Sequence, residues 1–141
     1  MTYDFNGLTA VVTGAGSGIG LAVTKKLSSG GAKVIALDLN PGECEEFATW
    51  IQCDIGDDQS VKRAFQEIST TTSSLDILIN NAGIGAQGTV ESASTDDWHK
   101  VLNINVVGTS RVSAAALPYL RKSSQRSEEH TSELQSHSDL V

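Results

Sequence analysis

The sequence predicts an α/β fold built on a doubly wound parallel sheet, for three reasons. Short apolar runs alternate with helix-like segments up to about residue 120, which is typical of parallel strands joined by right-handed crossovers. Four glycines on alternate positions, from Gly14 to Gly20, follow the first apolar run and lead into the first helix. Polar residues follow each later run. At 141 residues the chain forms one domain at most.

The first strand and helix flank the glycine run. The strand is expected at Leu8–Val12, an apolar run that stops at Thr13. The helix is expected over Gly18–Ser29 and ends at Gly30-Gly31. Ile19, Val23 and Leu27 are spaced along one face of this helix.

Two further strands are short β-branched and apolar runs that each end at an aspartate. The second strand is expected at Val34–Leu37, before Asp38, and the third at Trp50–Cys53, before Asp54. Between them, Asn40-Pro41-Gly42 has the composition of a turn.

The alternation continues through the middle of the chain. A helix is expected over Asp57–Ile68, with acids in its first turn and apolar side chains at helical spacing. A loop rich in threonine and serine leads to a fourth strand at Leu75–Ile79, which Asn80-Asn81-Ala82-Gly83 follows.

A long helix is expected after Ser94. The Ser94 hydroxyl can cap the first turn while Asp97 reaches back, a variant of the capping box. The expected buried stripe of this helix consists of Val101, Leu102, Val106, Val112 and Ala116.

The glycine run predicts a binding site for a dinucleotide. Glycines let the backbone approach a pyrophosphate, and the following helix offers unpaired N–H groups. Ligands of parallel sheets lie at the carboxyl ends of the strands, and Gly14, Asp38, Asp54 and Asn80 all come just past such ends. One alternative is that the glycines form a turn that merely links a strand to a helix. Another is a methyltransferase, although methyltransferases usually carry an acid where this chain has Thr13.

Asp38 predicts the choice of dinucleotide. It follows Gly20 by 18 residues, close to the offset of an acid that binds the adenosine ribose hydroxyls. A carboxylate there would repel a 2′-phosphate, and neither Ser17 nor Leu39 is a cation. We therefore expect NAD rather than NADP. The alternative is that Asp38 only starts the turn at Asn40.

Asp54 is a second candidate acid, because it follows the third strand. Its carboxylate could accept a hydrogen bond from the adenine amino group while Ile55 packs on the ring. The alternative is an acid that caps the helix beginning near Gly56-Asp57.

Three motifs together resemble the short-chain dehydrogenase/reductase (SDR) family. Residues 13–20, TGAGSGIG, resemble its TGxxxGIG motif, and residues 80–83 resemble its NNAG motif. Asn103-Ile104-Asn105-Val106 resembles the segment that carries its active-site asparagine. The resemblance covers residues 5 to about 122 and implies a Rossmann-type sheet. Family members have seven parallel strands, of which four can be identified here, in the order 3-2-1-4.

The resemblance also implies roles for single residues. Asn105 would be the catalytic asparagine, which distorts its helix and holds a water in a proton relay. The alternative is a mid-helix asparagine bonded to neighbouring backbone. Asn80 would brace neighbouring strands. The backbone that holds the pyrophosphate and neighbouring ribose would be at Gly14, Ser17, Gly18 and Ile19. The residues that line the adenosine ribose side would be Asn81, Ala82 and Gly83.

The catalytic pair of the family, Tyr-x-x-x-Lys, has no match in this sequence. Tyr3 is followed four positions later by Gly7, and Tyr119 by Ser123. Ser110 and Ser113 precede the region where the family's catalytic serine lies. We therefore expect residues 1–125 to be the N-terminal, NAD-binding part of a longer enzyme, without activity of their own.

The tail at residues 126–141, RSEEHTSELQSHSDLV, differs in character from the rest. It resembles the in-frame translation of a widely used sequencing adapter, so we interpret it as non-native. A disordered native terminus is the alternative.

Composition excludes several classes of protein. The net charge of −7 argues against a nucleic-acid partner, and no run is long enough for a membrane span. No metal site is expected. Cys44 and Cys53 fit neither a metal site nor a disulfide pattern, so we expect reduced thiols packed as small apolar groups. No secretory leader is visible, and the expected location is cytoplasmic.

The function expected from the sequence is that of an NAD-dependent oxidoreductase. The whole protein would interconvert an alcohol and a ketone or other carbonyl by hydride transfer. It would be a homo-oligomer, although oligomerisation of this chain alone is doubtful. The alternative is a non-catalytic dinucleotide-binding or sensor protein, and a methyltransferase ranks third.

Overall fold

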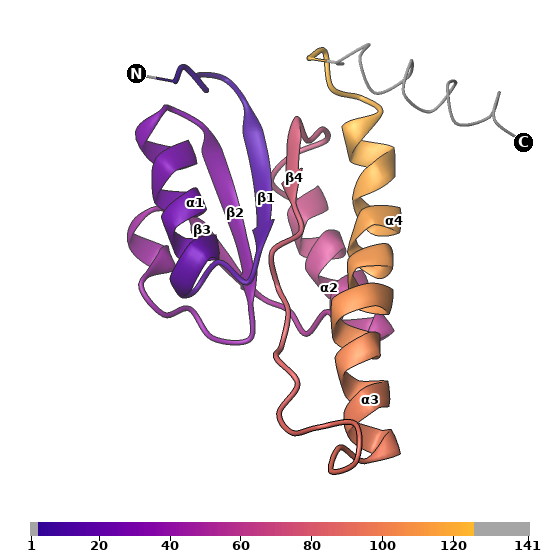
Figure 1. Ribbon diagram of the computed structural model, residues 1–141. Coiled ribbons are helices and arrows are strands. Elements are labelled where there is room, and N and C mark those ends of the chain that lie inside the picture. Colours follow the sequence, from indigo (N-terminus) through magenta and orange to yellow (C-terminus); the bar gives the residue numbers. More distant parts are fainter. Residues whose placement is uncertain (1–2, 126–141) are drawn as a thin grey trace, which may run out of the picture.

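The computed structural model describes residues 3–125, which form one sheet covered by helices on both faces (Figure 1). All strands pair in parallel in the order β3-β2-β1-β4, so the predicted fold class and strand order are confirmed. The tail at residues 126–141 lies outside the described residues. The strands are β1 Thr9–Thr13, β2 Lys33–Asp38, β3 Thr49–Gln52 and β4 Ile77–Ile79.

Strand β4 is shorter than the predicted Leu75–Ile79. Leu75 is completely buried, but its N–H donates to the carbonyl of Tyr119 at 3.1 Å rather than to a neighbouring strand. The apolar run therefore includes one core residue that anchors the end of a helix, and sheet pairing starts only at Ile77.

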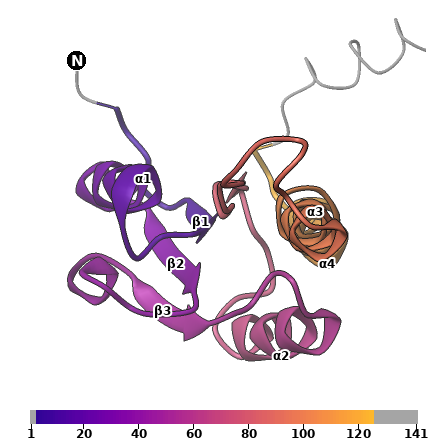
Figure 2. The ribbon, with the colours of Figure 1, turned by 60° about the horizontal axis from the view of Figure 1, so that its bottom comes forward.

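The helices divide between the two faces of the sheet. Helix α1 covers one face, and α2 and α4 cover the other (Figure 2). Along β1, Val11 points to the α2–α4 side while Ala10 and Val12 point to the α1 side, the alternation expected of a strand buried on both faces. The helical elements are α1 Gly18–Ser29, η1 Cys44–Glu46, α2 Asp58–Ser69, α3 Thr95–Leu102, η2 Asn103–Gly108 and α4 Thr109–Leu120.

Helix α1 has the predicted bounds but a different buried face. Its buried residues are Gly20, Thr24 and Leu27, whereas Ile19 is 77% exposed. The apolar face that begins at Ile19 is therefore not the face that packs on the sheet at the first turn. Because a side chain at position 20 would collide with the backbone of β1's exit loop, the inward face of the first turn requires glycine rather than a large apolar residue.

The long helix predicted after Ser94 contains a π-helical segment. The capping box of Ser94 and Asp97 is present as predicted. In η2 each hydrogen bond then spans five residues rather than the four of an α-helix, which inserts one extra residue. This extra residue rotates α3 relative to α4. The inward positions of η2 and α4 are Asn103, Gly108, Val112 and Ala116.

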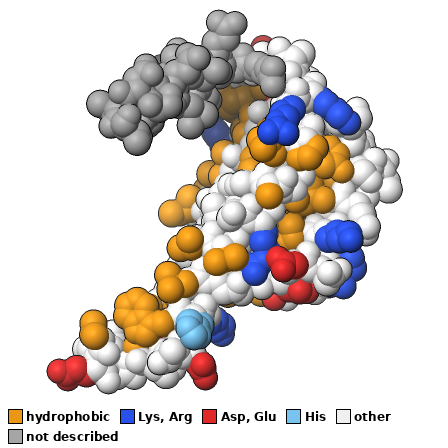
Figure 3. Space-filling view, turned by 90° about the vertical axis from the view of Figure 1, so that its right-hand side faces the viewer, with side chains coloured by type: hydrophobic (Ala, Val, Ile, Leu, Met, Phe, Trp, Pro, Cys, Tyr) orange, Lys and Arg blue, Asp and Glu red, His pale blue; other side chains and the backbone are white. Residues whose placement is uncertain are grey.

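The rotation explains why two of the five residues of the predicted stripe are exposed. Val112 and Ala116 are buried, but Leu102 is 48% and Val106 is 59% exposed, so their predicted burial is wrong. A stripe with a constant 3.6-residue period cannot continue through a π-helical turn. Hydrophobic side chains are accordingly visible on the outer face of α3, η2 and α4 (Figure 3).

Thr24 offers a test of how α1 packs on the sheet. Its side chain is completely buried, and its hydroxyl has no hydrogen-bond partner among the described residues. An unpaired buried hydroxyl is destabilising, so Thr24→Val should raise the free energy of unfolding by about 1 kcal/mol. Urea denaturation measures this difference. A decrease in stability would show that the hydroxyl has a partner in solution.

Candidate functional site

A cleft of about 300 Å³ lies at the carboxyl end of the sheet, where the sequence places its candidate residues. Most of the predicted nucleotide-binding residues line it, but Gly18 and Ile19 do not. The lining residues are Gly14, Ser17, Leu37, Asp38, Leu39, Cys53, Asp54, Ile55, Asn81, Ala82, Gly83, Ile84 and Ile104.

The glycine run forms a turn with no room for side chains. Gly14 has a φ of +65°, and a Cβ there would lie 2.9 Å from the Cα of Ala82. A Cβ on Gly20 would lie 2.0 Å from the Gly14 carbonyl oxygen. The loop is therefore packed tightly against both its own helix and the segment after β4.

Helix α1 differs from α2 and α3 at its N-terminus. Asp57 caps α2 and Ser94 caps α3 through their side chains, whereas Ser17 of α1 makes no such hydrogen bond, and the first turn carries no acid. Gly18 has a φ of +55° and open space where a Cβ would lie. The first-turn N–H groups of α1 therefore have no side-chain cap among residues 3–125, which favours an anionic partner.

Asp38 lies at the last position of β2 and is held by two backbone donors. Its Oδ2 accepts a hydrogen bond from the N–H of Gly16 at 2.9 Å, and its Oδ1 accepts one from the N–H of Asn40 at 3.3 Å. The carboxylate thus joins the glycine loop to the turn after β2. Asp38 therefore bonds the turn at Asn40, as the alternative interpretation expected, and it also lines the cleft.

Asp54 does not cap helix α2. Asp57 is the N-cap, and its carboxylate accepts from the N–H groups of Gln59 and Ser60 at 3.1 and 3.2 Å. The Oδ1 of Asp54 instead accepts from the N–H of Gly56 at 2.8 Å, so the helix-cap alternative for Asp54 is wrong.

Both cysteines are free and buried, as predicted. Cys53 lines the cleft, and burial raises the pKa of its thiol to about 11. The thiol is therefore neutral at physiological pH and contributes a small, weakly polar wall.

Asn81, rather than Asn80, braces the strands. The Nδ2 of Asn81 donates to the carbonyls of Thr13 and Gly14 at 3.1 and 3.2 Å, and its N–H donates to the Thr13 hydroxyl at 3.0 Å. Asn80 instead donates from Nδ2 to the hydroxyl of Ser113 on α4 at 3.1 Å. The predicted bracing role of Asn80 is therefore wrong.

Asn105 lies in the π-helical segment, so its helix is distorted as expected. Its side chain does not line the cleft. Its Oδ1 accepts from the N–H of Ile84, and its Nδ2 donates to the carbonyl of Ile84, both at 2.8 Å. The Thr109 hydroxyl donates to its main-chain carbonyl at 3.1 Å. The side chain therefore holds the segment after β4 in place.

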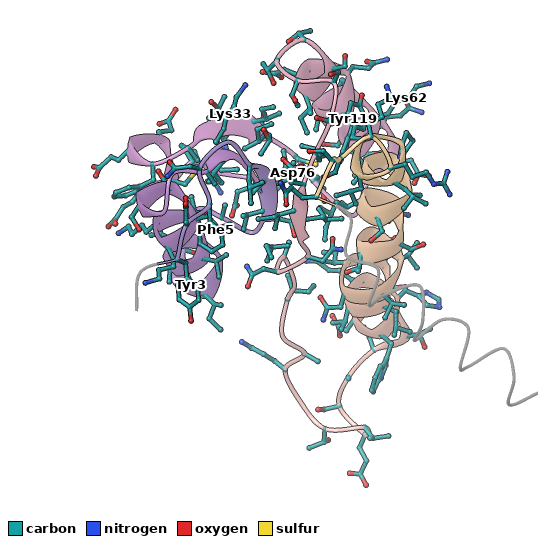
Figure 4. The ribbon with its side chains drawn as sticks, turned by 90° about the horizontal axis from the view of Figure 1, so that it is seen from above. Tyr3, Phe5, Lys33, Lys62, Asp76 and Tyr119 are labelled. Atoms are coloured by element: carbon teal, nitrogen blue, oxygen red, sulfur yellow. The ribbon has the colours of Figure 1, made fainter. Side chains whose placement is uncertain are left out.

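Neither tyrosine reaches the cleft. Tyr119 lies at the end of α4 beside α2, where its hydroxyl donates to the Phe65 carbonyl at 3.4 Å (Figure 4). Tyr3 stacks on Phe5 with ring centroids 6.0 Å apart. The carbonyl of Tyr119 accepts from the N–H of Leu75, just before β4, whereas Asp38 lies at the carboxyl end of β2.

Two further features are absent from residues 3–125. No helix in this part of the chain is long and apolar enough to cross a membrane. The same residues contain no group of three or more histidine, cysteine, aspartate or glutamate side chains that could hold a metal ion.

Comparison with known proteins decides the family. The family described as short chain dehydrogenase matches residues 8–127. The chain belongs to this family. Its parallel sheet, glycine turn and NNAG segment are thus those of a short-chain dehydrogenase, and the resemblance noted in the sequence is confirmed.

Relatives within the short-chain dehydrogenase family share sequence and fold. D-threitol dehydrogenase of Mycolicibacterium smegmatis is 35% identical over 76% of this chain and 46% of its own. The 3-ketoacyl-(acyl-carrier-protein) reductase of Brucella melitensis, solved with NADH, is 30% identical with a TM-score of 0.76, over 82% and 51% of the two chains. Pseudomonas aeruginosa RhlG, solved with NADP, is 27% identical with a TM-score of 0.80, over 89% and 53%.

The relatives differ from this chain in length, and the two structural neighbours differ in the dinucleotide that they bind. The chain spans about half the length of the curated relatives that it matches. One structural neighbour was solved with NADH and another with NADP, so structures of both dinucleotide complexes occur among the neighbours.

Some of the residues that line the cleft were not predicted from the sequence. Leu39 directly follows Asp38 at the strand end, so its position was a usable signal. Ile84 comes just after NNAG and could have been included on the same ground. Ile104 was named only as part of the motif at residues 103–106, and it lines the cleft from within the π-helical segment.

Proposed function

We propose that the chain is the nucleotide-binding part of an NAD-dependent oxidoreductase that interconverts an alcohol and a carbonyl. The observation that carries this proposal is the Asp38 carboxylate, which lines the cleft and is held by the N–H groups of Gly16 and Asn40. A fixed carboxylate suits the hydroxyls of an adenosine ribose and repels a 2′-phosphate. Among residues 3–125, no lysine or arginine lines the cleft, so no cation of that part of the chain offsets the repulsion.

The remaining residues fit the other parts of the dinucleotide. The uncapped N-terminus of α1, with Gly14 and Ser17 beside it, suits the pyrophosphate. Asp54 and Ile55 would hold adenine, and residues 81–83 would line the adenosine ribose. Gly18 and Ile19 would contribute through their backbone alone, since they do not line the cleft.

The bound nicotinamide supplies the hydride chemistry of such an enzyme. Asn105 would support it by fixing Ile84 at the edge of the cleft, and its proposed part in a proton relay would involve its main chain. Residues 1–141 contain no Tyr-x-x-x-Lys sequence, so we propose no turnover by this chain alone. An alcohol or ketone would be the substrate of the whole protein.

Titration calorimetry with the purified chain tests the proposal. NAD should bind saturably, and NADP should bind at least about tenfold more weakly because Asp38 and the 2′-phosphate carry like charges. S-adenosylmethionine should not bind. Binding of S-adenosylmethionine without NAD would contradict the proposal and support a methyltransferase.

A further inference from the structure

Asp54 and Ile55, the residues proposed to hold adenine, lie in a short loop that side chains of the helical layer hold in place. Asp54, Ile55 and Gly56 lie between β3 and α2 and belong to neither element. Two side chains from the helical layer bond to the carbonyls of this loop. The Nδ2 of Asn103 donates to the Gly56 carbonyl at 2.9 Å, and the Nη1 of Arg111 donates to the Ile55 carbonyl at 3.2 Å.

These two side chains are also bonded to each other. The Nη2 of Arg111 donates to the Oδ1 of Asn103 at 2.9 Å, and its Nε is paired with the Asp58 carboxylate. The Arg111 side chain is only 19% exposed. Its planar guanidinium can make all of these bonds at once, which a lysine could not do. We call Asn103 and Arg111 the loop clamp.

Close packing supports the same arrangement. A Cβ on Gly108 would lie 2.9 Å from the Ile55 carbonyl oxygen, and a Cβ on Gly56 would lie 3.2 Å from the Nδ2 of Asn103. The loop is therefore seated directly on η2. The π-helical turn is what places Asn103 on this inward side, because in a regular helix it would not be in phase with Gly108.

The clamp can act on the ligand through one hydrogen bond. The N–H of Gly56 donates to the Oδ1 of Asp54, so the position of Gly56 sets the direction of that carboxylate. Asn103 fixes the carbonyl of the same Gly56, and Arg111 fixes the preceding carbonyl. A connected path of bonds thus runs from helix α4 to the acid beside the proposed adenine site.

We propose that Asn103 and Arg111 are positioning residues that aim Asp54 at the amino group of adenine. The inference rests on the proposed function, since it assumes that the cleft binds NAD. It adds two residues that do not themselves line the cleft and assigns them the selectivity for adenine over bases without an amino group.

The test compares NAD with nicotinamide hypoxanthine dinucleotide, whose base has a carbonyl in place of the adenine amino group. The wild-type chain should bind NAD about tenfold more tightly, because an acceptor without its donor is penalised. Arg111→Met and Asn103→Ala should reduce this ratio to about threefold or less. The control is Arg121→Met, since Arg121 is an exposed arginine at the end of the same helix and should keep the wild-type ratio. A general loss of structure weakens both ligands equally and leaves the ratio unchanged.

Hydrogen exchange of the Gly56 amide in the free chain gives a second readout. Arg111→Met should speed this exchange about tenfold, and Arg121→Met should not. If the wild-type chain binds NAD but Arg111→Met leaves the ratio of the two affinities unchanged, the loop clamp is contradicted and the proposed function is not. If the wild-type chain binds no NAD, the proposed function is contradicted. If Arg111→Met also leaves the exchange rate of the Gly56 amide unchanged, the loop clamp is contradicted as well.

Discussion

Replacing Gly20 by alanine is expected to abolish NAD binding and to lower the free energy of unfolding by about 3 kcal/mol. A Cβ at this position would lie 2.0 Å from the Gly14 carbonyl oxygen and 2.5 Å from the Nδ2 of Asn81. Neither atom can move easily, because Asn81 bonds the carbonyls of both Thr13 and Gly14. Helix α1 would have to move away from the sheet, and the loop that surrounds the proposed pyrophosphate site would open.

Urea denaturation and NAD titration measure the two effects of Gly20→Ala. Gly85→Ala is the matched control, because a Cβ on Gly85 meets nothing within 4 Å and its φ is not positive. The control should retain wild-type stability and binding. If Gly20→Ala binds NAD with wild-type affinity, the close contact between α1 and the glycine loop does not exist in solution.

Replacing Asp38 by alanine is expected to change the affinities for the two dinucleotides in opposite directions. NAD should bind about tenfold to a hundredfold more weakly, because charged hydrogen bonds to the ribose hydroxyls are lost. NADP should bind at least about threefold more tightly, because the like charge beside its 2′-phosphate is gone. Loss of the bonds to Gly16 and Asn40 would by itself weaken both ligands.

The opposite signs therefore separate recognition from simple loosening of the loop. Calorimetric titration of Asp38→Ala with both dinucleotides provides the two dissociation constants. Glu45→Ala removes one exposed acid from η1 and should leave both constants unchanged. Equal weakening of NAD and NADP by Asp38→Ala would remove Asp38 from the ribose site and leave it only as a brace for the turn.

Features with a local chemical cause could be predicted from the sequence. The strand order, the bounds of α1 and the capping box of Ser94 all agree with expectation. The helix bounds and the capping box depend on residues a few positions apart, such as glycines where a backbone must approach closely or a hydroxyl three residues before an acid. The strand order was implied by the resemblance to the family. The gathering of Gly14, Asp38 and Asp54 in one cleft follows from parallel strands that end at a common edge.

Features that depend on distant contacts could not be predicted. Nothing in the NNAG segment indicates which asparagine turns toward β1, and the partner of Asn81 is nearly 70 residues away in sequence. The exposure of Leu102 follows from a change of helical period that no apolar pattern records. Such features depend on how helices and strands far apart in the sequence pack against one another, which a single sequence shows only indirectly.

The π-helical segment also affects how positions in this chain should be counted. A choice of surface substitutions usually assumes that residues three or four apart share a face. Across residues 103–108 that assumption selects the wrong side, because the turn contains an additional residue. Positions in α3 keep the phase set by Ser94, and positions in α4 keep the phase set by Gly108. If one helical period is assumed from α3 through α4, substitutions meant for the surface would fall on buried positions, and charged side chains would be introduced into the core.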